Sequence, residues 1–349
     1  MKIYFSESSK KKYFKYVDEI LSSNRWTEGK MLRLFEEEFE EFSGLHAVGV
    51  NSGGAALALL YEYVGVKDRD VIIPANTFWA TSAAAKRAGA NVIYADCNKE
   101  DLCLSYEDLV NRVTANTAAV TVVHIGGHIA FDIKKTAEFC RENGIALIED
   151  CAHAHGAVFN DLSPGSWGIG GAYSFYATKT LPTGEGGILV TADKDLADWA
   201  KIQRNYGKKS LNGRIQYESK TGFNYRMSEF IAALGRVQLE NLPEVLEWKR
   251  ELGRKYNSIF ENRVRLPSGM KSGFYKYIAF DYDIAEETGK VYAESDQCHH
   301  IDGCNLHLPN SEWIAGHHCC PPIYYGWEHA ENSIDELYGI LSVNKKWTK

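Results

Sequence analysis

A lysine and an aspartate in this chain have the residue types and surroundings that a carbonyl cofactor would need. Lys179 lies between an aromatic strand-like run and a Gly-Glu-Gly-Gly turn, and Asp150 closes an apolar run that starts at Ile145. An amine can form a Schiff base with an aldehyde, and a carboxylate can hold a pyridinium nitrogen protonated. We therefore expect a pyridoxal phosphate enzyme in which both residues stand at strand ends.

A turn of small residues could hold the phosphate of such a cofactor. Gly53 and Gly54 stand between a strand pattern and a helix pattern, where glycines let the backbone approach a ligand and helix-terminal amides favour an anion. Ser174 could add a hydroxyl to the same phosphate. A small-residue turn is more often only a turn, and Ser174 could instead be a buried serine bonded to the backbone.

Several of these side chains have a structural alternative. Asp150 could cap a following helix. His153 could touch the cofactor ring or its phenolic oxygen, or it could be a histidine satisfied by structural hydrogen bonds. Phe78 offers a flat face for stacking on a pyridine ring, although an aromatic residue is more often part of the core. Lys179 would be a surface lysine if its aromatic and glycine-rich flanks were ignored.

The elements that must position these residues alternate from about residue 46. Short apolar runs, expected to be strands buried on both faces, are separated by helix-like stretches, which predicts a mostly parallel α/β sheet. Ligands bind at the carboxyl ends of the strands in such sheets, where Gly53, Phe78 and Asp150 would stand. The expected strands are 47–50, 71–73, 92–95, 118–123, 145–148 and 188–191, and the expected helices are 11–22, 31–42, 54–64, 79–88, 106–113, 132–143 and 226–262.

The pattern changes after the last of these helices. We expect a domain boundary near residue 240, with a large domain over residues 1–240, whose N-terminal helices occupy 1–45, and a smaller C-terminal domain over 241–349. A strand is expected over 275–282 in the smaller domain. The chain has 349 residues, of which 45% are hydrophobic and 24% charged, as is typical of a soluble globular protein with a large core.

Charge and cysteine content exclude several classes of function. The net charge of −7 argues against a nucleic-acid or membrane-surface partner. No signal peptide is indicated, and no apolar run reaches the length of a membrane span. The 8 cysteines are scattered without a disulfide framework, which indicates reduced thiols. We therefore expect a cytoplasmic protein.

Seven segments together resemble the DegT/DnrJ/EryC1/StrS family of pyridoxal phosphate-dependent sugar aminotransferases. They occur in the family's order between residue 26 and about residue 240, and the C-terminal part matches more loosely around Cys320–Tyr324. The matching segments are Ser52–Leu57, Pro74–Thr81, Glu149–Gly156, Ser174–Lys179, Gly184–Gly187, Arg204–Gly207 and Gly222–Ser228.

The resemblance implies the α/β architecture of fold type I pyridoxal phosphate-dependent transferases (aspartate aminotransferase-like), with a mostly parallel sheet in the large domain and a smaller C-terminal α/β domain. It implies that Lys179 is the Schiff-base lysine and that Asp150 contacts the pyridinium nitrogen. By the same resemblance Phe78 stacks on the cofactor ring and His153 lies beside it.

The phosphate of the cofactor is held, by resemblance, by Gly53, Gly54 and Ser174. Asn224 would reach the phosphate of the neighbouring subunit's cofactor, which implies a homodimer with shared active sites. The family usually has Thr or Ser at the position of Gly54 and often has Gln at that of His153. A proline is common where this chain has Ile129. These departures leave the sugar specificity open.

The resemblance implies transfer of an amino group to a keto-sugar, commonly nucleotide-linked, with glutamate as the amino donor. One alternative is a sugar dehydratase of the same fold, but those relatives have histidine in place of the lysine found here at 179. A regulatory or binding protein on this scaffold is a second alternative, and it would be expected to have lost Lys179 or Asp150.

A C-terminal stretch rich in histidine and cysteine is a further candidate site. The spacings match no regular zinc finger, so a loop-rich substrate mouth is favoured and no metal site is predicted. By loose resemblance His299 lies in the segment that approaches the substrate. The stretch comprises Cys298, His299, His300, Cys304, His307, His317, His318, Cys319 and Cys320.

Overall fold

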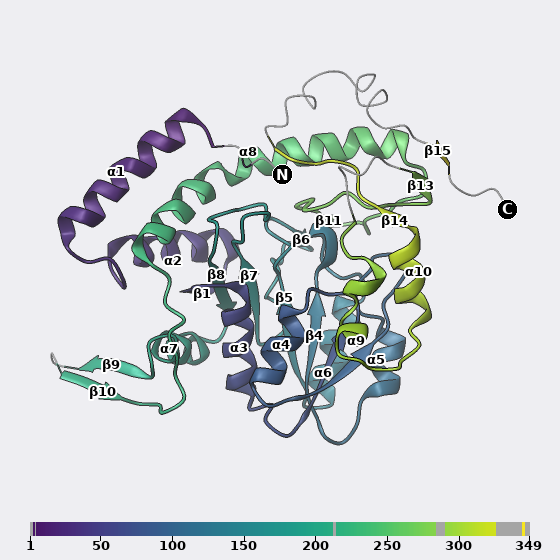
Figure 1. Cartoon of the computed structure of the whole chain (residues 1–349), viewed down its shortest axis with the longest axis horizontal. Helices are drawn as coiled ribbons and strands as arrows, with labels where there is room; N and C mark the ends of the chain where they lie inside the picture. Colours follow the sequence, from purple (N-terminus) through teal and green to yellow (C-terminus); the bar gives the residue numbers. More distant parts are fainter. Residues whose placement is uncertain (1–2, 4, 212–213, 284–289, 326–343, 346–349) are drawn as a thin grey trace.

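A seven-stranded sheet forms the centre of the molecule in the computed structural model, which describes residues 3, 5–211, 214–283, 290–325 and 344–345 (Figure 1). The strand order is β1-β8-β7-β5-β4-β2-β3. Neighbouring strands from β7 to β3 are parallel, whereas β8 is antiparallel to both β1 and β7. The strands are β1 (His46–Val50), β2 (Asp70–Pro74), β3 (Asn91–Ala95), β4 (Thr117–Val123), β5 (Ala146–Asp150), β7 (Gly170–Ser174) and β8 (Gly187–Thr191).

Helices cover both faces of this sheet, as expected for strands buried on both sides. Leu189 of β8 packs in one core with α3, α4 and α7. Its neighbours Ile188 and Val190 pack in another core with α2 (Lys30–Ser43) and α8 (Glu229–Ile259). A third core lies under α5, α6 and α10. These helices are α3 (Gly53–Val64), α4 (Ala80–Arg87), α5 (Tyr106–Arg112), α6 (Ile133–Glu142), α7 (Lys194–Gln203) and α10 (Pro309–His317).

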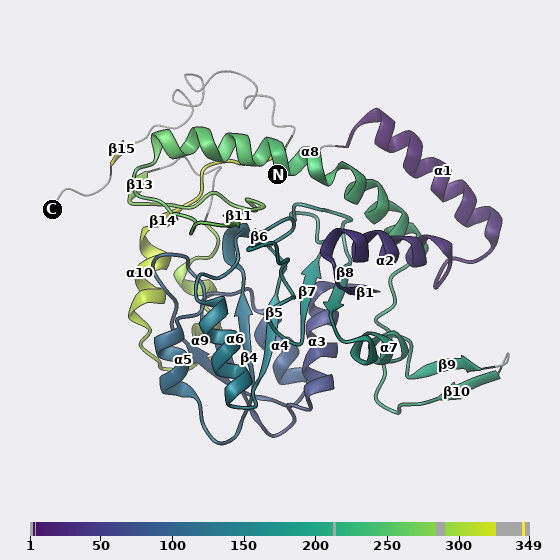
Figure 2. The same cartoon turned by 180° about the vertical axis from the view of Figure 1, so that it is seen from behind.

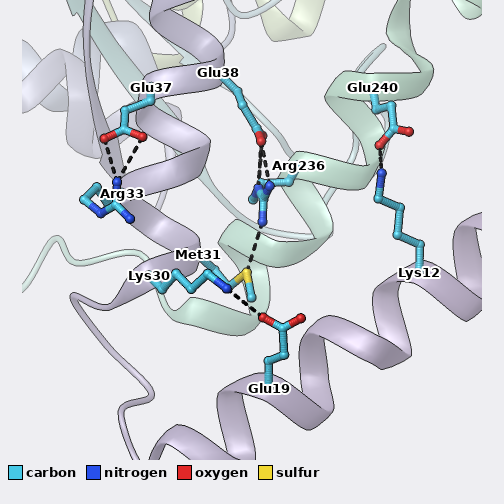
Figure 3. Close-up of polar contacts among 9 residues, drawn as sticks. All are labelled: Lys12, Glu19, Lys30, Met31, Arg33, Glu37, Glu38, Arg236 and Glu240. Atoms are coloured by element: carbon cyan, nitrogen blue, oxygen red, sulfur yellow. Dashed lines mark hydrogen bonds and ion pairs between the residues drawn. The ribbon is translucent and has the colours of Figure 1, made fainter.

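Two N-terminal helices, α1 (Glu7–Ser23) and α2 (Lys30–Ser43), pack on the long helix α8 (Glu229–Ile259). Figure 3 shows ion pairs between these helices, including a two-pronged contact in which Arg236 donates to Glu38 at 2.7 to 3.1 Å. Lys30 of α2 also pairs with Glu19 of α1 at 3.0 Å. The three helices therefore form one packed unit, which shares a core with one face of β1, β8 and β7 (Figure 2).

The carboxylate of Glu229 caps the start of α2 from the first turn of α8. It accepts hydrogen bonds from the backbone N–H groups of Gly29 at 2.9 Å, Met31 at 2.7 Å and Leu32 at 3.1 Å. A Cβ atom at Gly29 would lie 2.7 Å from this carboxylate, so glycine leaves the space that the cap occupies. The first backbone N–H groups of a helix have no acceptor within the helix, and the Glu229 carboxylate supplies one for three of them.

Besides the sheet and its helices, the described chain has several short elements, most of which follow α8. The structure has no continuous strand over 275–282, because only Ala279–Phe280 and Tyr282–Asp283 pair with other segments. The short elements are η1 (Ile125–Gly127), β6 (Val158–Phe159), β11 (Met270–Lys271), β12 (Ala279–Phe280), β13 (Tyr282–Asp283), η2 (Glu294–Asp296), α9 (Cys298–Ile301), β14 (His318–Cys319) and β15 (Asn344–Lys345).

The expected strands and helices of the sheet are present with ends that differ by a few residues. Strand β7, the helices α7 and α10, and a hairpin of β9 (Lys208–Leu211) and β10 (Arg214–Tyr217) were not among the expected ranges. The hairpin projects from the body in both views (Figures 1 and 2). The boundary expected near residue 240 falls within α8, and the division into 1–240 and 241–349 stays a prediction. Residues 284–289, 326–343 and 346–349 of the second part lie outside the described residues.

Within the part of the chain that is described, we find no helix with the length and apolar character needed to span a bilayer.

Candidate active site

The residues expected to hold a phosphate meet at the carboxyl ends of β1 and β7. Gly187, the first residue of β8, pairs with Val50 on one side and with Ser174 on the other. A Cβ atom at Gly187 would lie 2.5 Å from the backbone nitrogen of Gly53, and one at Gly53 would lie 2.8 Å from the Cβ of Ser174. Only glycines permit this approach, which brings Gly53 against Ser174.

Helix α3 begins at this point. Ser52 caps it by accepting a hydrogen bond from the amide of Ala55 at 3.1 Å. Gly54 follows in the first turn, where a Cβ atom would meet nothing closer than the Ser52 hydroxyl oxygen at 3.9 Å. The free amides and positive end of a helix favour a phosphate here, and the space above Gly54 leaves room for one.

Asp150 is the last residue of β5 and is buried. The Thr81 hydroxyl donates to one carboxylate oxygen at 2.8 Å, and the Ala152 amide donates to the other at 3.1 Å. Because Thr81 donates to Asp150, its oxygen accepts the proton of the Thr77 hydroxyl at 2.9 Å. The helix-cap alternative for Asp150 is wrong, since turns and not a helix follow β5.

Burial raises the pKa of Asp150, although Thr81, Ala152 and the charge of Lys179 oppose the rise. A buried carboxylate of this kind is stabilised by a cationic hydrogen-bond donor. The protonated nitrogen of a pyridine ring is such a donor. The surroundings of Asp150 therefore fit the expected role, which Thr81 would support by fixing the orientation of the carboxylate.

Lys179 lies in a turn beyond the end of β7 and not at a strand end, which corrects the expectation from the sequence. Its backbone N–H donates to the carbonyl of Tyr176 at 2.9 Å. Its side-chain amine lies 4.8 Å from the ring centre of Tyr275. Burial lowers the pKa of the Lys179 amine to about 8, with Asp150 opposing and Lys276 adding to the decrease. The amine is thus neutral far more often than an ordinary lysine at the same pH.

The ring of His153 stacks on that of Tyr275, with ring centres 4.0 Å apart. Nδ1 of His153 is buried, and no residue of the described ranges offers it a hydrogen bond. Burial, followed by the charges of Lys179 and Lys276, lowers the pKa of His153 well below its usual value, so the ring is neutral. A neutral imidazole with a free nitrogen can face a cofactor ring or its phenolic oxygen.

Phe78 follows β2 and is 78% exposed, the largest exposed fraction among the large hydrophobic residues that are described. The exposed ring leaves a flat aromatic face on which a ligand ring could stack. Together, the glycine cradle, the buried Asp150, the free His153 nitrogen and the uncovered Phe78 ring fit pyridoxal phosphate.

Asn224 and His299 lie in separate places. Asn224 is exposed, and its backbone carbonyl accepts a hydrogen bond from the Asn51 side chain at 3.1 Å, close in sequence to the glycine cradle. His299 is fully buried, and neither ring nitrogen has a partner among the described residues. Its helix α9 docks on the loop that carries Phe78, where the Cys298 amide donates to Ala75 at 2.9 Å. Both roles stay predictions.

The C-terminal histidines and cysteines form no group of potential metal ligands within the described ranges, but two other buried groups exist. Their donor atoms are engaged in hydrogen bonds. In the group of Glu149, His124 and Cys151, the carboxylate of Glu149 accepts the His124 ring N–H at 2.9 Å and three backbone amides at 2.7 to 2.8 Å. In the other group, which comprises Asp101, Cys103 and His128, both carboxylate oxygens of Asp101 accept hydrogen bonds from backbone amides.

Sequence reasoning assigned no role to three residues of this site: Thr81, Tyr275 and Lys276. Thr81 was part of a matching segment, so its position three residues after Phe78 was a usable signal. Tyr275 and Lys276 were expected only as strand residues. No local pattern marks them, because segments far away in the sequence bring them to the site.

Known proteins share this fold and much of this sequence. GDP-perosamine synthase of Vibrio cholerae is 34% identical over 70% of this chain and 66% of its own length. A dTDP-4-dehydro-2,3,6-trideoxy-D-glucose 4-aminotransferase of Saccharopolyspora spinosa is 31% identical over 75% of this chain and 73% of its own. The crystal structure of DesV from S. venezuelae, in complex with a ketimine intermediate, superposes with a TM-score of 0.83 and 25% identity, over 96% of this chain and 93% of that one.

The family model of the DegT/DnrJ/EryC1/StrS aminotransferases matches residues 7–279. The predicted fold class, reaction class and cofactor, pyridoxal phosphate, are thereby confirmed at the level of the family. The chain belongs to the DegT/DnrJ/EryC1/StrS aminotransferase family.

Proposed function

We propose that this protein transfers an amino group from glutamate to a nucleotide-linked keto-sugar. The observation that carries the proposal is the partly buried amine of Lys179, with a pKa of about 8, near the buried carboxylate of Asp150. The names of the relatives include sugars linked to GDP and to dTDP, which supports a nucleotide-linked substrate without selecting the base. A dehydratase is disfavoured because residue 179 is lysine.

When bound, pyridoxal phosphate supplies an aldehyde that captures amino groups and a protonated ring that accepts electrons. Gly53, Gly54 and Ser174 would hold its phosphate, and Asp150 would keep its ring nitrogen protonated. Phe78 would stack on the ring, and His153 would lie beside it. Lys179 would anchor the aldehyde and, once released by the donor, take the proton from the donor's α-carbon at its Nζ atom. A pKa of about 8 suits an amine that must both accept and return a proton near neutral pH.

We also propose a cytoplasmic homodimer with shared active sites. All eight cysteines are free and seven are buried, which supports a reducing compartment. Exposed apolar side chains on two outlying elements support the presence of a second subunit. Phe14 of α1 is 66% exposed, and Ile215 and Tyr217 of the projecting hairpin are 65% and 67% exposed.

The substitution Lys179→Ala tests this function. The purified protein, loaded with pyridoxal phosphate, is mixed with L-glutamate and a panel of nucleotide-linked keto-sugars, and amino-sugar products are measured by mass spectrometry. We expect Lys179→Ala to lower kcat by at least about 10³-fold, since both the anchor and the proton carrier are lost. Lys67→Ala, an exposed lysine just before β2 at the opposite end of the strands, is the matched control and should keep full activity. A fully active Lys179→Ala variant would refute the assignment.

A further inference from the structure

A second lysine, Lys276, lies near the same aromatic ring as Lys179, and no role has been assigned to it above. Its ammonium group lies 5.9 Å from the ring centre of Tyr275 and 5.8 Å from that of Tyr324. The Lys179 amine lies 4.8 Å from the same Tyr275 ring. Tyr275 and Tyr324 also line, with Lys179 and Lys249, a small cavity of about 70 Å³. The two amines thus approach one aromatic side chain at the edge of one cavity.

The backbone around Lys276 is fixed against the carboxyl end of β4. The Lys276 amide donates to the carbonyl of Gly126 at 2.9 Å, and the Gly273 amide donates to that of Gly127 at 2.8 Å. Gly126 has a φ of 72°, and a Cβ atom there would lie 2.5 Å from the side chain of Ile278. The glycines therefore allow the segment that carries Tyr275 and Lys276 to dock directly on the active-site edge of the sheet.

Two cations of α8 hold the same segment from the other side. The buried amine of Lys249 donates to the carbonyls of Phe274 at 3.0 Å and Ile323 at 2.8 Å. Arg250 donates to the carbonyl of Ser272 at 3.1 Å and to that of Gly156, in the loop after His153, at 2.7 Å. Lys276 is thus on a segment that is tied to both the sheet and α8.

The positive charge of Lys276 is not compensated by a carboxylate in the described structure. Its effect reaches the neighbouring groups: burial lowers the pKa of Lys179 and of Lys249, and the charge of Lys276 lowers each further. Asp150 is the carboxylate that raises the pKa of Lys179 against this effect. It already accepts a hydrogen bond from Thr81, and it is the proposed partner of the cofactor's ring nitrogen. Among the described residues, Asp150 is the one carboxylate that acts on these two amines.

We infer that Lys276 binds a carboxylate of the amino donor. The inference rests on the proposed function. A carboxylate of an α-amino acid is bonded directly to the carbon whose proton Lys179 would remove, so an ammonium that shares a ring contact with Lys179 is within its reach. The diphosphate of a nucleotide-linked sugar is the rival anion, since Lys276 also borders a cavity of about 260 Å³ that includes Arg263 and Arg265. The sugar ring would separate that diphosphate from the reacting carbon.

The test compares Lys276→Gln, which removes the charge, with Lys276→Arg, which keeps it. Lys271→Gln, an exposed lysine on the same segment, is the matched control. In the cofactor-loaded protein, single turnovers with L-glutamate are followed by the absorbance of the cofactor, and the dissociation constants of glutarate, GDP and dTDP are measured by calorimetry. Melting temperatures verify that each variant is folded.

We expect Lys276→Gln to raise the half-saturating L-glutamate concentration and the glutarate dissociation constant at least tenfold, about 1.4 kcal/mol. GDP and dTDP binding should change less than twofold, and Lys276→Arg should restore most of the loss. Unchanged glutarate binding overturns the inference, and weaker nucleotide binding with unchanged glutarate binding assigns the diphosphate instead. If wild-type protein does not react with L-glutamate, the proposed function fails, and glutarate binding alone decides the role of Lys276.

Discussion

At the scale of single residues, the site depends on an unusual environment for one amine. The amines of Lys179, Lys249 and Lys276 act on one another electrostatically. Burial lowers the pKa of Lys179 to about 8 and that of Lys249 to about 7. Desolvation disfavours the charged form of an amine, and neighbouring positive charges disfavour it further. Lys179 can therefore act as a nucleophile and base at a pH where an exposed lysine is almost fully protonated.

This environment predicts how Lys179 responds to pH in the cofactor-free protein. Below pH 8 the amine is protonated and unreactive, and above it the amine is neutral, so its acetylation by acetic anhydride should rise with pH and level off above about pH 8. The acetylation rate is measured by mass spectrometry of the peptide that contains Lys179. The same peptide, acetylated after its release from the protein by digestion, is the reference, and its lysine should have a pKa of about 10.4. Equal profiles for protein and peptide would contradict the prediction. Lys276→Gln should move the protein profile to higher pH.

At the scale of elements, six of the seven strands of the sheet were predictable because they are short apolar runs that separate helices. The seventh, β7, has the sequence Gly-Gly-Ala-Tyr-Ser and is not such a run. The strand that ends at Asp150 and the helix that begins at Gly53 follow from such local patterns. The position of Tyr275 and Lys276 does not, because it results from hydrogen bonds to Gly126 and Gly127 and from the cations of α8. The expectation that Lys179 stands at a strand end was wrong because a sequence pattern marks a strand but not the turn that follows it. Strand β7 ends at Ser174, and Lys179 lies in the turn beyond it.

The cap of α2 gives a prediction for the N-terminal helices. Glu229→Ala removes the acceptor of three helix-terminal amides, which water reaches poorly because the side chain is buried. We expect the free energy of unfolding to fall by about 2 kcal/mol, measured by urea denaturation. Glu247→Ala is the matched control on the same helix. Its exposed carboxylate pairs with Arg254 at 3.0 Å, and the change should cost less than about 0.5 kcal/mol. Equal losses in both variants would show that the cap adds no stability.

At the scale of the whole molecule, Asn224 can contact the cofactor of its own subunit or that of the neighbouring subunit. The family resemblance predicts that Asn224 acts on the neighbouring subunit's cofactor, yet its backbone lies next to Asn51 of the same chain, just before the glycine cradle. The two possibilities make different predictions for a dimer built from two defective chains, one with Lys179→Ala and the other with Asn224→Ala.

If Asn224 acts across the interface, both defects of this mixed dimer fall in one site, and the other site has an intact Lys179 and an intact Asn224. The mixed dimer, purified through two different affinity tags, should then have about half the wild-type activity, well above either parent homodimer. If Asn224 serves its own chain, each site carries one defect, and the activity should stay at or below that of the Asn224→Ala homodimer.

Size-exclusion chromatography with light scattering verifies the dimer first, and a monomeric wild-type protein would contradict the shared site directly. A tagged dimer of two wild-type chains controls for the tags. Recovery of activity on mixing therefore measures, without a structure of the complex, whether the predicted homodimer is required to complete the cofactor site.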